Sequence, residues 1–223
     1  MPKPELLKNT RHIRSFVRRD SRVTKAQALA LEKYLKKYQF QSGDAELGRF
    51  SALNLEIGAG DGQCTLGLAL ASPNKGYIAA EVYRSGLGRL LGAVADQSLS
   101  NVRVADVVQL LPVVPLGYFD TMMIFFPDPW PKKRHHKRRL LSAEFLDVLA
   151  PKLKHSGRLF IATDIEDYAL QVLELVEASN HWRNLAGPSM WAIRPNFRTL
   201  TKFEAKGLAA GRGAYEIFAC RNS

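Results

Sequence analysis

The sequence has little cysteine, a deficit of acidic residues and no long apolar run. Cys64 and Cys220 are the only cysteines among 223 residues, too few for a disulfide framework or a zinc site, so we expect two reduced core thiols and no metal. No apolar run approaches the roughly 20 residues of a membrane-spanning helix, and the N-terminus lacks the apolar segment of a secretory signal. These absences favour a cytoplasmic protein with no membrane partner.

The deficit of acids leaves a strongly basic chain. Lys and Arg number 32 against 21 Asp and Glu, which gives a formal net charge of +11. An excess of this size predicts a polyanionic partner such as a nucleic acid. The bases concentrate in residues 8–22 and 132–139. The first stretch has few apolar residues, so we predict an arm that either folds on binding or lies over the domain.

Apolar runs alternate with amphipathic stretches along most of the chain. This pattern predicts strands at residues 53–57, 76–81, 102–105, 121–126 and 158–163, and helices at 24–39, 64–70, 85–96, 140–154 and 165–179. Strands that alternate with helices form an α/β fold with a doubly wound, mostly parallel sheet. The tail from residue 182 lacks long helical periodicity, and we expect it to close the sheet with antiparallel strands. We divide the chain into an arm and helix, 1–41, and one domain, 42–223.

A glycine-rich turn follows the first predicted strand. The dinucleotide-binding fingerprint fails, because Gln63 or Thr65 stands where its third glycine is needed, and no Gly-Lys-Ser/Thr follows to make a P-loop. The pattern that remains is Glu-x-Gly-x-Gly-x-Gly, at Glu56, Gly58, Gly60 and Gly62. Acids end the next two predicted strands, at Glu81 and Asp106. An acid after the second strand suits the two hydroxyls of a ribose. Together these residues resemble the S-adenosylmethionine pocket of class I methyltransferases.

The fourth predicted strand ends in Pro-Asp-Pro-Trp-Pro, residues 127–131, directly before the basic block 132–139. Each proline biases the preceding residue toward extended backbone, so we expect that geometry at Phe126, Asp128 and Trp130. Ligands bind at the carboxyl ends of strands in open α/β sheets, which places Asp128 where chemistry is done. The alternative is that Asp128 only caps the strand and that the basic block is a solvated face. Trp130 either packs in the turn or provides a stacking surface for a base.

Four separated motifs carry a resemblance to a known family. Residues 127–139, Ile-Arg-Ser-Phe-Val-Arg-Arg at 13–19, Ala-Thr-Asp at 162–164 and Thr-Lys-Phe-Glu at 201–204 resemble the bacterial tRNA (guanine-N(7)-)-methyltransferases, the TrmB family. The resemblance covers nearly the whole chain. It implies a class I, Rossmann-like methyltransferase fold, S-adenosyl-L-methionine as cofactor, and methylation of nitrogen 7 of a variable-loop guanine in tRNA.

The resemblance also implies roles for individual residues, with Asp128 as the catalytic residue. The implied cofactor contacts are Glu56, Gly58, Gly60, Gly62, Glu81, Asp106 and Asp128. The implied contacts to the tRNA substrate are Lys132, Arg134, Arg138, Asp164, Thr201, Lys202, Phe203 and Glu204. For Thr201 and Glu204, the alternative is capping of a strand in a closing hairpin.

Two other functions compete with this interpretation. A non-catalytic RNA-binding module on a methyltransferase scaffold predicts a damaged cofactor pocket, whereas the glycine turn and Glu81 are intact. A small-molecule methyltransferase needs neither the basic arm nor the basic block. The sequence leaves open whether the protein is a monomer or a homodimer.

Overall fold

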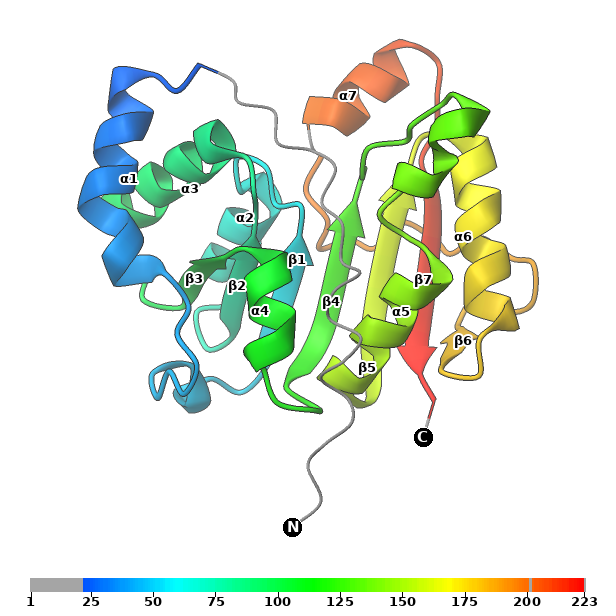
Figure 1. Cartoon of the computed structure of the whole chain (residues 1–223), viewed down its shortest axis with the longest axis horizontal. Coiled ribbons are helices and arrows are strands. Elements are labelled where there is room, and N and C mark those ends of the chain that lie inside the picture. Colours follow the sequence, from blue (N-terminus) through cyan, green and yellow to red (C-terminus); the bar gives the residue numbers. More distant parts are fainter. Residues whose placement is uncertain (1–21, 201, 223) are drawn as a thin grey trace.

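The computed structural model describes residues 22–200 and 202–222, and the predicted basic arm therefore lies outside the described residues (Figure 1). Seven strands of this part form one sheet in the order β3-β2-β1-β4-β5-β7-β6. Their bounds are β1 Leu53–Ile57, β2 Gly76–Ala80, β3 Val102–Ala105, β4 Phe119–Phe125, β5 Leu153–Thr163, β6 Trp182–Asn184 and β7 Tyr215–Arg221.

The strand directions confirm the predicted mixed sheet. Strands β1 to β5 are parallel, whereas β7 runs antiparallel to β5 and β6 antiparallel to β7. The order runs outward from β1 to β3 and then returns to place β4 on the other side of β1. The switch point of this doubly wound sheet thus lies between β1 and β4, where α/β proteins bind their ligands.

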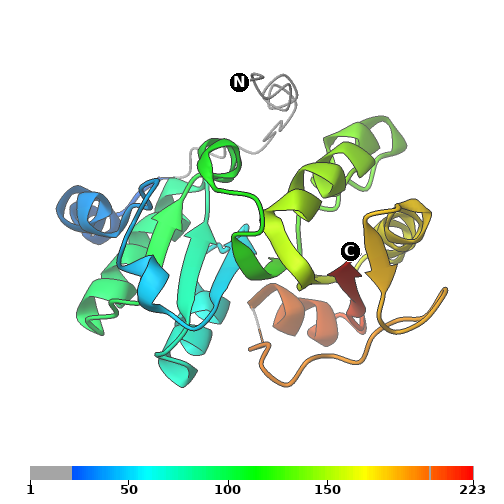
Figure 2. The ribbon, with the colours of Figure 1, turned by 90° about the horizontal axis from the view of Figure 1, so that it is seen from below.

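Helices cover both faces of the sheet (Figure 2). Their bounds are α1 Lys25–Tyr38, α2 Gln63–Ala71, α3 Arg84–Asp96, α4 Val107–Val113, α5 Ala143–Leu149, α6 Glu166–Ala178 and α7 Lys202–Ala209, with short 3-10 turns η2 Leu47–Arg49, η3 Lys133–Arg138 and η4 Ala150–Lys152. Helices α4, α5 and α6 pack on one face, and α2 and α3 on the other. Among the described helices, none combines the length and apolarity needed to cross a membrane.

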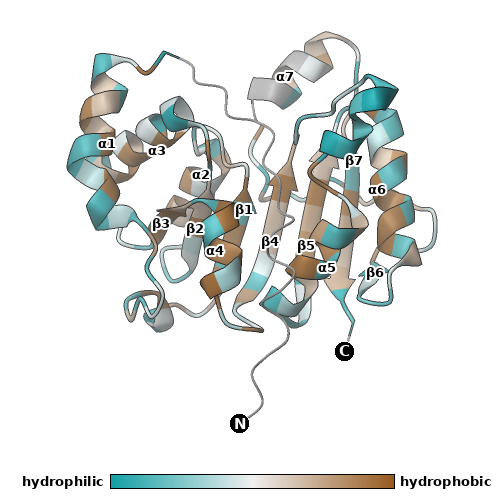
Figure 3. Ribbon diagram, viewed as in Figure 1, coloured by the Kyte–Doolittle hydropathy of each residue, from teal (hydrophilic) through white to brown (hydrophobic). Residues whose placement is uncertain are grey.

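The core follows from the alternation of side chains along β4. Met122 and Ile124 pack with α5 and α6 in one cluster, whereas Met123 and Phe125 pack toward Cys64 of α2 on the opposite face. A parallel strand that is buried on both faces reads as an unbroken apolar run, as this one does. Figure 3 shows mainly hydrophobic residues along the central strands and a mixture of hydrophilic and hydrophobic residues along the helices.

The structure differs from the predicted elements in its bounds and by two additional helices. The helix expected at 140–154 is only α5, because the Ser142 side chain caps its first turn and β5 already begins at Leu153. Helix α4 was not predicted, since it is short and contains Pro112. The tail holds helix α7 in addition to the expected antiparallel strands, and its eight residues are too few for a clear period.

Candidate active site

The carboxyl edge of the sheet gathers the predicted acids. Glu56 lies on β1, and Glu81, Asp106, Asp128 and Asp164 follow β2, β3, β4 and β5. Parallel strands end at one edge, so these side chains stand on both sides of the switch point (Figure 1). The structure therefore brings five acids, predicted one by one from sequence, to a single edge.

The glycine turn between β1 and α2 presents an open backbone surface. Gly58, Gly60 and Gly62 have φ values of 77°, 59° and 81°, a left-handed region that favours glycine. A Cβ atom built at Gly58 or Gly60 would meet no atom within 4 Å, whereas at Gly62 it would lie 2.3 Å from Leu90 Cδ1. The first two glycines thus leave room for a ligand, and the third allows α2 to pack closely on α3.

Glu81 is held against this turn. Its Oε2 accepts a hydrogen bond from the Gly60 amide at 2.6 Å, and its Oε1 accepts one from the Tyr83 amide at 2.7 Å. Burial raises the pKa of Glu81, and the negative charge of Asp128 adds to the increase. The charge of Asp128 thus acts on Glu81 across the switch point. A carboxylate has about four lone-pair positions, so Glu81 can accept further hydrogen bonds.

Glu56 and Asp106 have partners within the chain. Oε2 of Glu56 accepts hydrogen bonds from the backbone amide and the hydroxyl of Thr65, which ties β1 to the first turn of α2. Burial raises the pKa of Glu56 to about 7, although the hydrogen bonds from Thr65 oppose the increase. Asp106 caps α4 by accepting from the Val108 amide at 2.8 Å. Their predicted cofactor contacts remain predictions beside these structural roles.

The segment that follows β4, residues 126–131, is called the lip below. The Phe126 amide donates to the Ala162 carbonyl at 2.7 Å, so pairing with β5 continues to the start of the lip. The prediction of extended backbone is wrong at Phe126 and Trp130, whose φ values are 50° and 43°. A positive φ also avoids the right-handed helical region that a following proline disfavours. Because left-handed backbone costs about 1–2 kcal/mol per residue, neighbouring contacts must hold the lip.

Arg139 supplies such contacts, although the sequence places it in the basic block. Its Nε donates to the Pro129 carbonyl at 2.9 Å, its Nη1 to Gln171 Oε1 at 2.7 Å and its Nη2 to Asp167 Oδ2 at 2.6 Å. The guanidinium is buried and lies 4.7 Å from the centre of the Tyr168 ring. This arginine anchors the lip to α6 and is not available to a partner.

The rest of the basic block stays at the surface beyond the lip, where η3 forms a hydrophilic turn (Figure 3). Lys132 and Arg134 are exposed, and the Arg138 guanidinium lies 5.0 Å from the Trp130 ring. That ring also meets His135 edge-on, with ring centres 5.9 Å apart, so the indole packs against η3. The pKa of His135 is lowered by desolvation and then by the surrounding cations, Arg138, Arg134, Lys132 and Lys137.

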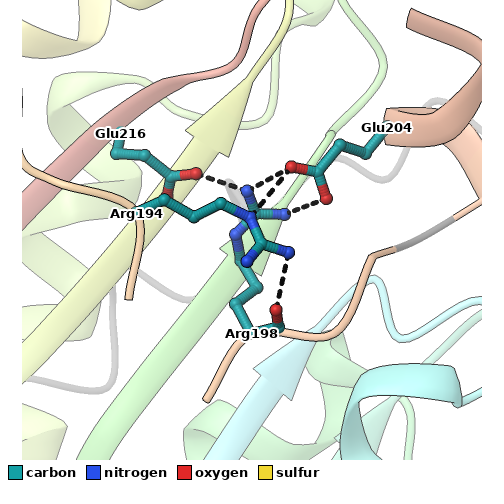
Figure 4. Close-up of polar contacts among 4 residues, drawn as sticks. All are labelled: Arg194, Arg198, Glu204 and Glu216. Atoms are coloured by element: carbon teal, nitrogen blue, oxygen red, sulfur yellow. Dashed lines mark hydrogen bonds and ion pairs between the residues drawn. The ribbon is translucent and has the colours of Figure 1, made fainter. Parts of the chain in front are cut away.

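The predicted substrate contacts near the C-terminus lie beyond β5. Oδ2 of Asp164 pairs with Arg212 Nε at 2.9 Å. Glu204 lies in helix α7, so the hairpin alternative is wrong for this residue, and both its oxygens accept from Arg198 at 2.6 Å (Figure 4). Thr201 and the side chains of Lys202 and Phe203 lie outside the described part of the chain.

Sequence reasoning missed the arginines that form ion pairs with acids at this edge of the sheet. Arg212 lies 48 residues from Asp164, and Arg139 lies 28 residues from Asp167. No periodicity or local motif connects residues at such separations, and a solitary arginine in a basic chain carries no signal of its own. Among the described residues, no cluster of three or more His, Cys, Asp or Glu side chains could hold a metal ion.

Comparison with known proteins shows the family of this chain. A family model described as "Putative methyltransferase" matches residues 51–217. The tRNA (guanine-N(7)-)-methyltransferase of Nitrosospira multiformis is 43% identical over 216 residues, which cover 93% of each chain. The enzyme of the same name from Polaromonas sp. is 41% identical over 218 residues, 93% of this chain and 89% of the relative. The chain belongs to the tRNA (guanine-N(7)-)-methyltransferase family.

Solved structures confirm the fold of this family member. An antibiotic-related methyltransferase superposes with a TM-score of 0.56 over 85% of this chain and 98% of its own, at 20% identity. An aminoglycoside resistance methyltransferase gives 0.54 over 80% and 91%, at 16% identity. At these identities the likeness concerns the fold, a class I Rossmann-like methyltransferase, as the sequence predicted.

Proposed function

We propose that this protein transfers the methyl group of S-adenosyl-L-methionine to nitrogen 7 of a guanine in tRNA. The observation that carries the proposal is the junction of three features at the switch point. An open glycine turn faces Glu81, Asp128 acts electrostatically on Glu81, and the lip that carries Asp128 continues into the exposed bases of η3. A methyl-donor site and a surface for a polyanion thus adjoin one carboxylate.

The residues of the turn fit this cofactor. The turn leads directly into α2, a nine-residue helix whose N-terminal amides suit the carboxylate of an amino acid. Gly58 and Gly60 leave the adjoining backbone uncovered, and Glu81 can accept from a ribose diol. We assign Asp106 to the adenine end and keep Glu56 and Gly62 as supports of the turn. The cofactor supplies an electrophilic methyl group bound to a positively charged sulfur.

The chain then has to orient the acceptor and compensate charge. Nitrogen 7 of neutral guanine carries a lone pair and no proton, so no general base is required at that atom. The base becomes cationic as it is methylated, and fixed carboxylates stabilise such developing charge without reorganisation. We assign this role to Asp128 and Asp164. In-line positioning supplies the other part of the rate enhancement.

Recognition of guanine calls for an acceptor on its Watson–Crick edge, where the ring N–H and the exocyclic amine both donate. Arg212 binds Oδ2 of Asp164, and we propose Oδ1 of the same carboxylate as one acceptor. We propose that Glu204, Thr201, Lys202 and Phe203 supply further contacts to the acceptor guanine. Adenine lacks this pair of donors, so carboxylates at these positions select guanine.

The basic surface delivers the tRNA. We propose that Lys132, Arg134 and Arg138 contact phosphates, and that residues 1–41 form an arm and helix that extend this surface from the methyltransferase domain, residues 42–223. A tRNA substrate and two buried free cysteines support a cytoplasmic location.

The direct test is nucleoside analysis of tRNA after incubation with the protein and labelled S-adenosylmethionine. We expect 7-methylguanosine in unmodified tRNA and no label in small-molecule acceptors. Asp128→Ala should lower transfer by about 100-fold or more while leaving the melting temperature and tRNA binding near wild type. Label in another nucleoside, or normal turnover by the variant, would contradict the proposal.

A further inference from the structure

The polar cluster around Arg198 lies next to the proposed acceptor site (Figure 4). Arg198 is only 1% exposed, yet its Nη1 and Nη2 donate to the two oxygens of Glu204 at 2.6 Å each. Nη2 also donates to Oε1 of Glu216. Arg194 joins through its Nε, 3.2 Å from Glu204 Oε1, and through its Nη2, 2.7 Å from the Arg198 carbonyl. Two arginines and two acids thus form one cluster, in which Arg198, Glu204 and Glu216 are buried and Arg194 is exposed.

The groups around the Arg198 guanidinium come from three different elements of the fold. Glu204 lies on α7 and Glu216 on β7, while the guanidinium stands 5.5 Å and 5.3 Å from the ring centres of Phe125 and Phe126. Phe126 has a left-handed backbone and begins the lip that carries Asp128. One guanidinium therefore contacts both α7 and the end of β4.

The residue after Arg198 contacts helix α2, which follows the glycine turn. A Cβ atom at Gly67, on this helix, would lie 3.0 Å from Thr199 Cγ2, so the Thr199 methyl group packs against the Gly67 backbone. The segment at 198–199 consequently touches the helix after the glycine turn, the lip and the acceptor side of the proposed site.

This arrangement has a stability cost that an apolar residue would avoid. A buried ion pair is often no more stable than well-packed apolar side chains of the same volume. What the planar fork of arginine adds is direction, since two parallel bonds fix the plane of a carboxylate. Burial alone would raise the pKa of Glu204, but the hydrogen bonds and charges of Arg198 and Arg194 outweigh it and lower this pKa. Glu204 is thereby kept ionised and oriented.

We propose that Arg198 is a positioning residue for methyl transfer, one that fixes the Glu204 carboxylate relative to the lip so that the acceptor base is held in a single orientation toward Asp128. The inference rests on the proposed function, because it concerns the acceptor side of that site. Arg198 acts through Glu204 and Phe126 and does not itself contact the reacting atoms.

The test has to separate positioning from folding. Arg198→Met alone would leave Glu204 and Glu216 buried around a missing cation, so its loss of activity would be ambiguous. In Arg198→Met/Glu216→Gln, one buried charge of each sign is removed, and Arg194 still pairs with Glu204. The matched control is Arg103→Met, since Arg103 is also a buried arginine, is held by Asp44 and Glu46, and lies on edge strand β3.

We expect the two variants to differ in kcat, but not in cofactor binding, at a temperature where both are folded. The double variant should bind S-adenosylmethionine as tightly as Arg103→Met does in calorimetry, and its KM for tRNA should change little. Its kcat should fall by about 100-fold, the effect of misplacing a reacting group by about 1 Å. Arg103→Met should keep the wild-type kcat. Arg198→Lys should fail to rescue, because an ammonium cannot hold both oxygens of Glu204 in one plane.

Each outcome bears on one of the two proposals. If wild-type protein forms 7-methylguanosine and the double variant or Arg198→Lys does so at the same kcat, positioning by Arg198 is refuted and the proposed function stands. A loss of kcat in the double variant that Arg103→Met shares equally would also refute it, since the effect would then be one of stability. If wild-type protein forms no 7-methylguanosine, both proposals fall.

Discussion

Replacement of Arg139 by methionine should destabilise the protein and misplace the lip. Methionine can fill the space of the aliphatic stem, so the loss is mainly polar. The bond to Asp167 is charge-assisted and worth about 1.5–3 kcal/mol, and the lower part of this range applies because the Asp167 side chain is 53% exposed and rehydrates. With the donors to Pro129 and Gln171 also lost, we expect about 3 kcal/mol in total. For a chain of this size, that lowers Tm by about 6–12 °C.

The matched control is Arg134→Met, an exposed arginine of the same basic block. It should change stability by less than about 0.5 kcal/mol, and it should weaken tRNA binding and reduce the slope of log K against log salt by about 1. Thermal melts and salt titrations of both variants, together with transfer rates measured well below Tm, distinguish the two roles. We expect Arg139→Met to lose kcat and to keep the wild-type salt slope. Equal Tm values for the two variants would refute the assignment of Arg139 to the lip.

Two further predictions concern the glycine turn and the acid beneath it. Gly60→Ala should weaken binding of S-adenosylmethionine more than it lowers stability, whereas Gly62→Ala should lower stability more than it weakens binding. The reason is that only the methyl group added at Gly62 would meet Leu90. Calorimetry measures the binding of each variant, and thermal melts measure its stability. Glu56 has a pKa of about 7 in the folded protein and an ordinary value of 4.5, so the folded state holds a proton that the unfolded state releases between these values. The free energy of unfolding of the wild type should therefore fall as pH rises through this window, by up to about 3 kcal/mol relative to Glu56→Gln. Urea denaturation of both proteins from pH 5 to 8 measures this difference. If the free energies of unfolding of the two proteins changed in parallel with pH, a raised pKa of Glu56 would be excluded.

The donor half of the site could be predicted because its signals are local. Each strand is a short apolar run, and the acid at its end is the next polar residue in the chain, as with Glu81 after β2 and Asp106 after β3. The parallel arrangement then follows from the alternation with helices, and it brings these acids to one edge. Sequence patterns of this kind need no knowledge of the partner strand.

The supports of the site could not be predicted, because they depend on pairs that only the folded chain brings together. Arg139 and Arg134 are equivalent by composition and spacing, yet one is buried against α6 and the other is exposed. Arg198 lies against the ring of Phe126, far from it in the sequence, and binds Glu216 of β7. The left-handed backbone at Phe126 likewise depends on its bond to Ala162, so the local preference before proline was a poor guide.

Arg139 and Arg198, the buried arginines beside the lip, suggest why the basic charge of this chain is divided between surface and interior. A cation that binds phosphate must stay solvated until the tRNA arrives, so Arg134 gains nothing from a fixed position. A cation that holds an acid must be desolvated and directional, which Arg139 and Arg198 achieve with charge-assisted bonds in low-dielectric surroundings. Because both kinds adjoin the lip, loss of either should reduce transfer, but only loss of a surface cation should alter its dependence on salt. The salt dependence of methyl transfer, more than its rate, therefore distinguishes arginines that bind tRNA from arginines that hold the site residues in position.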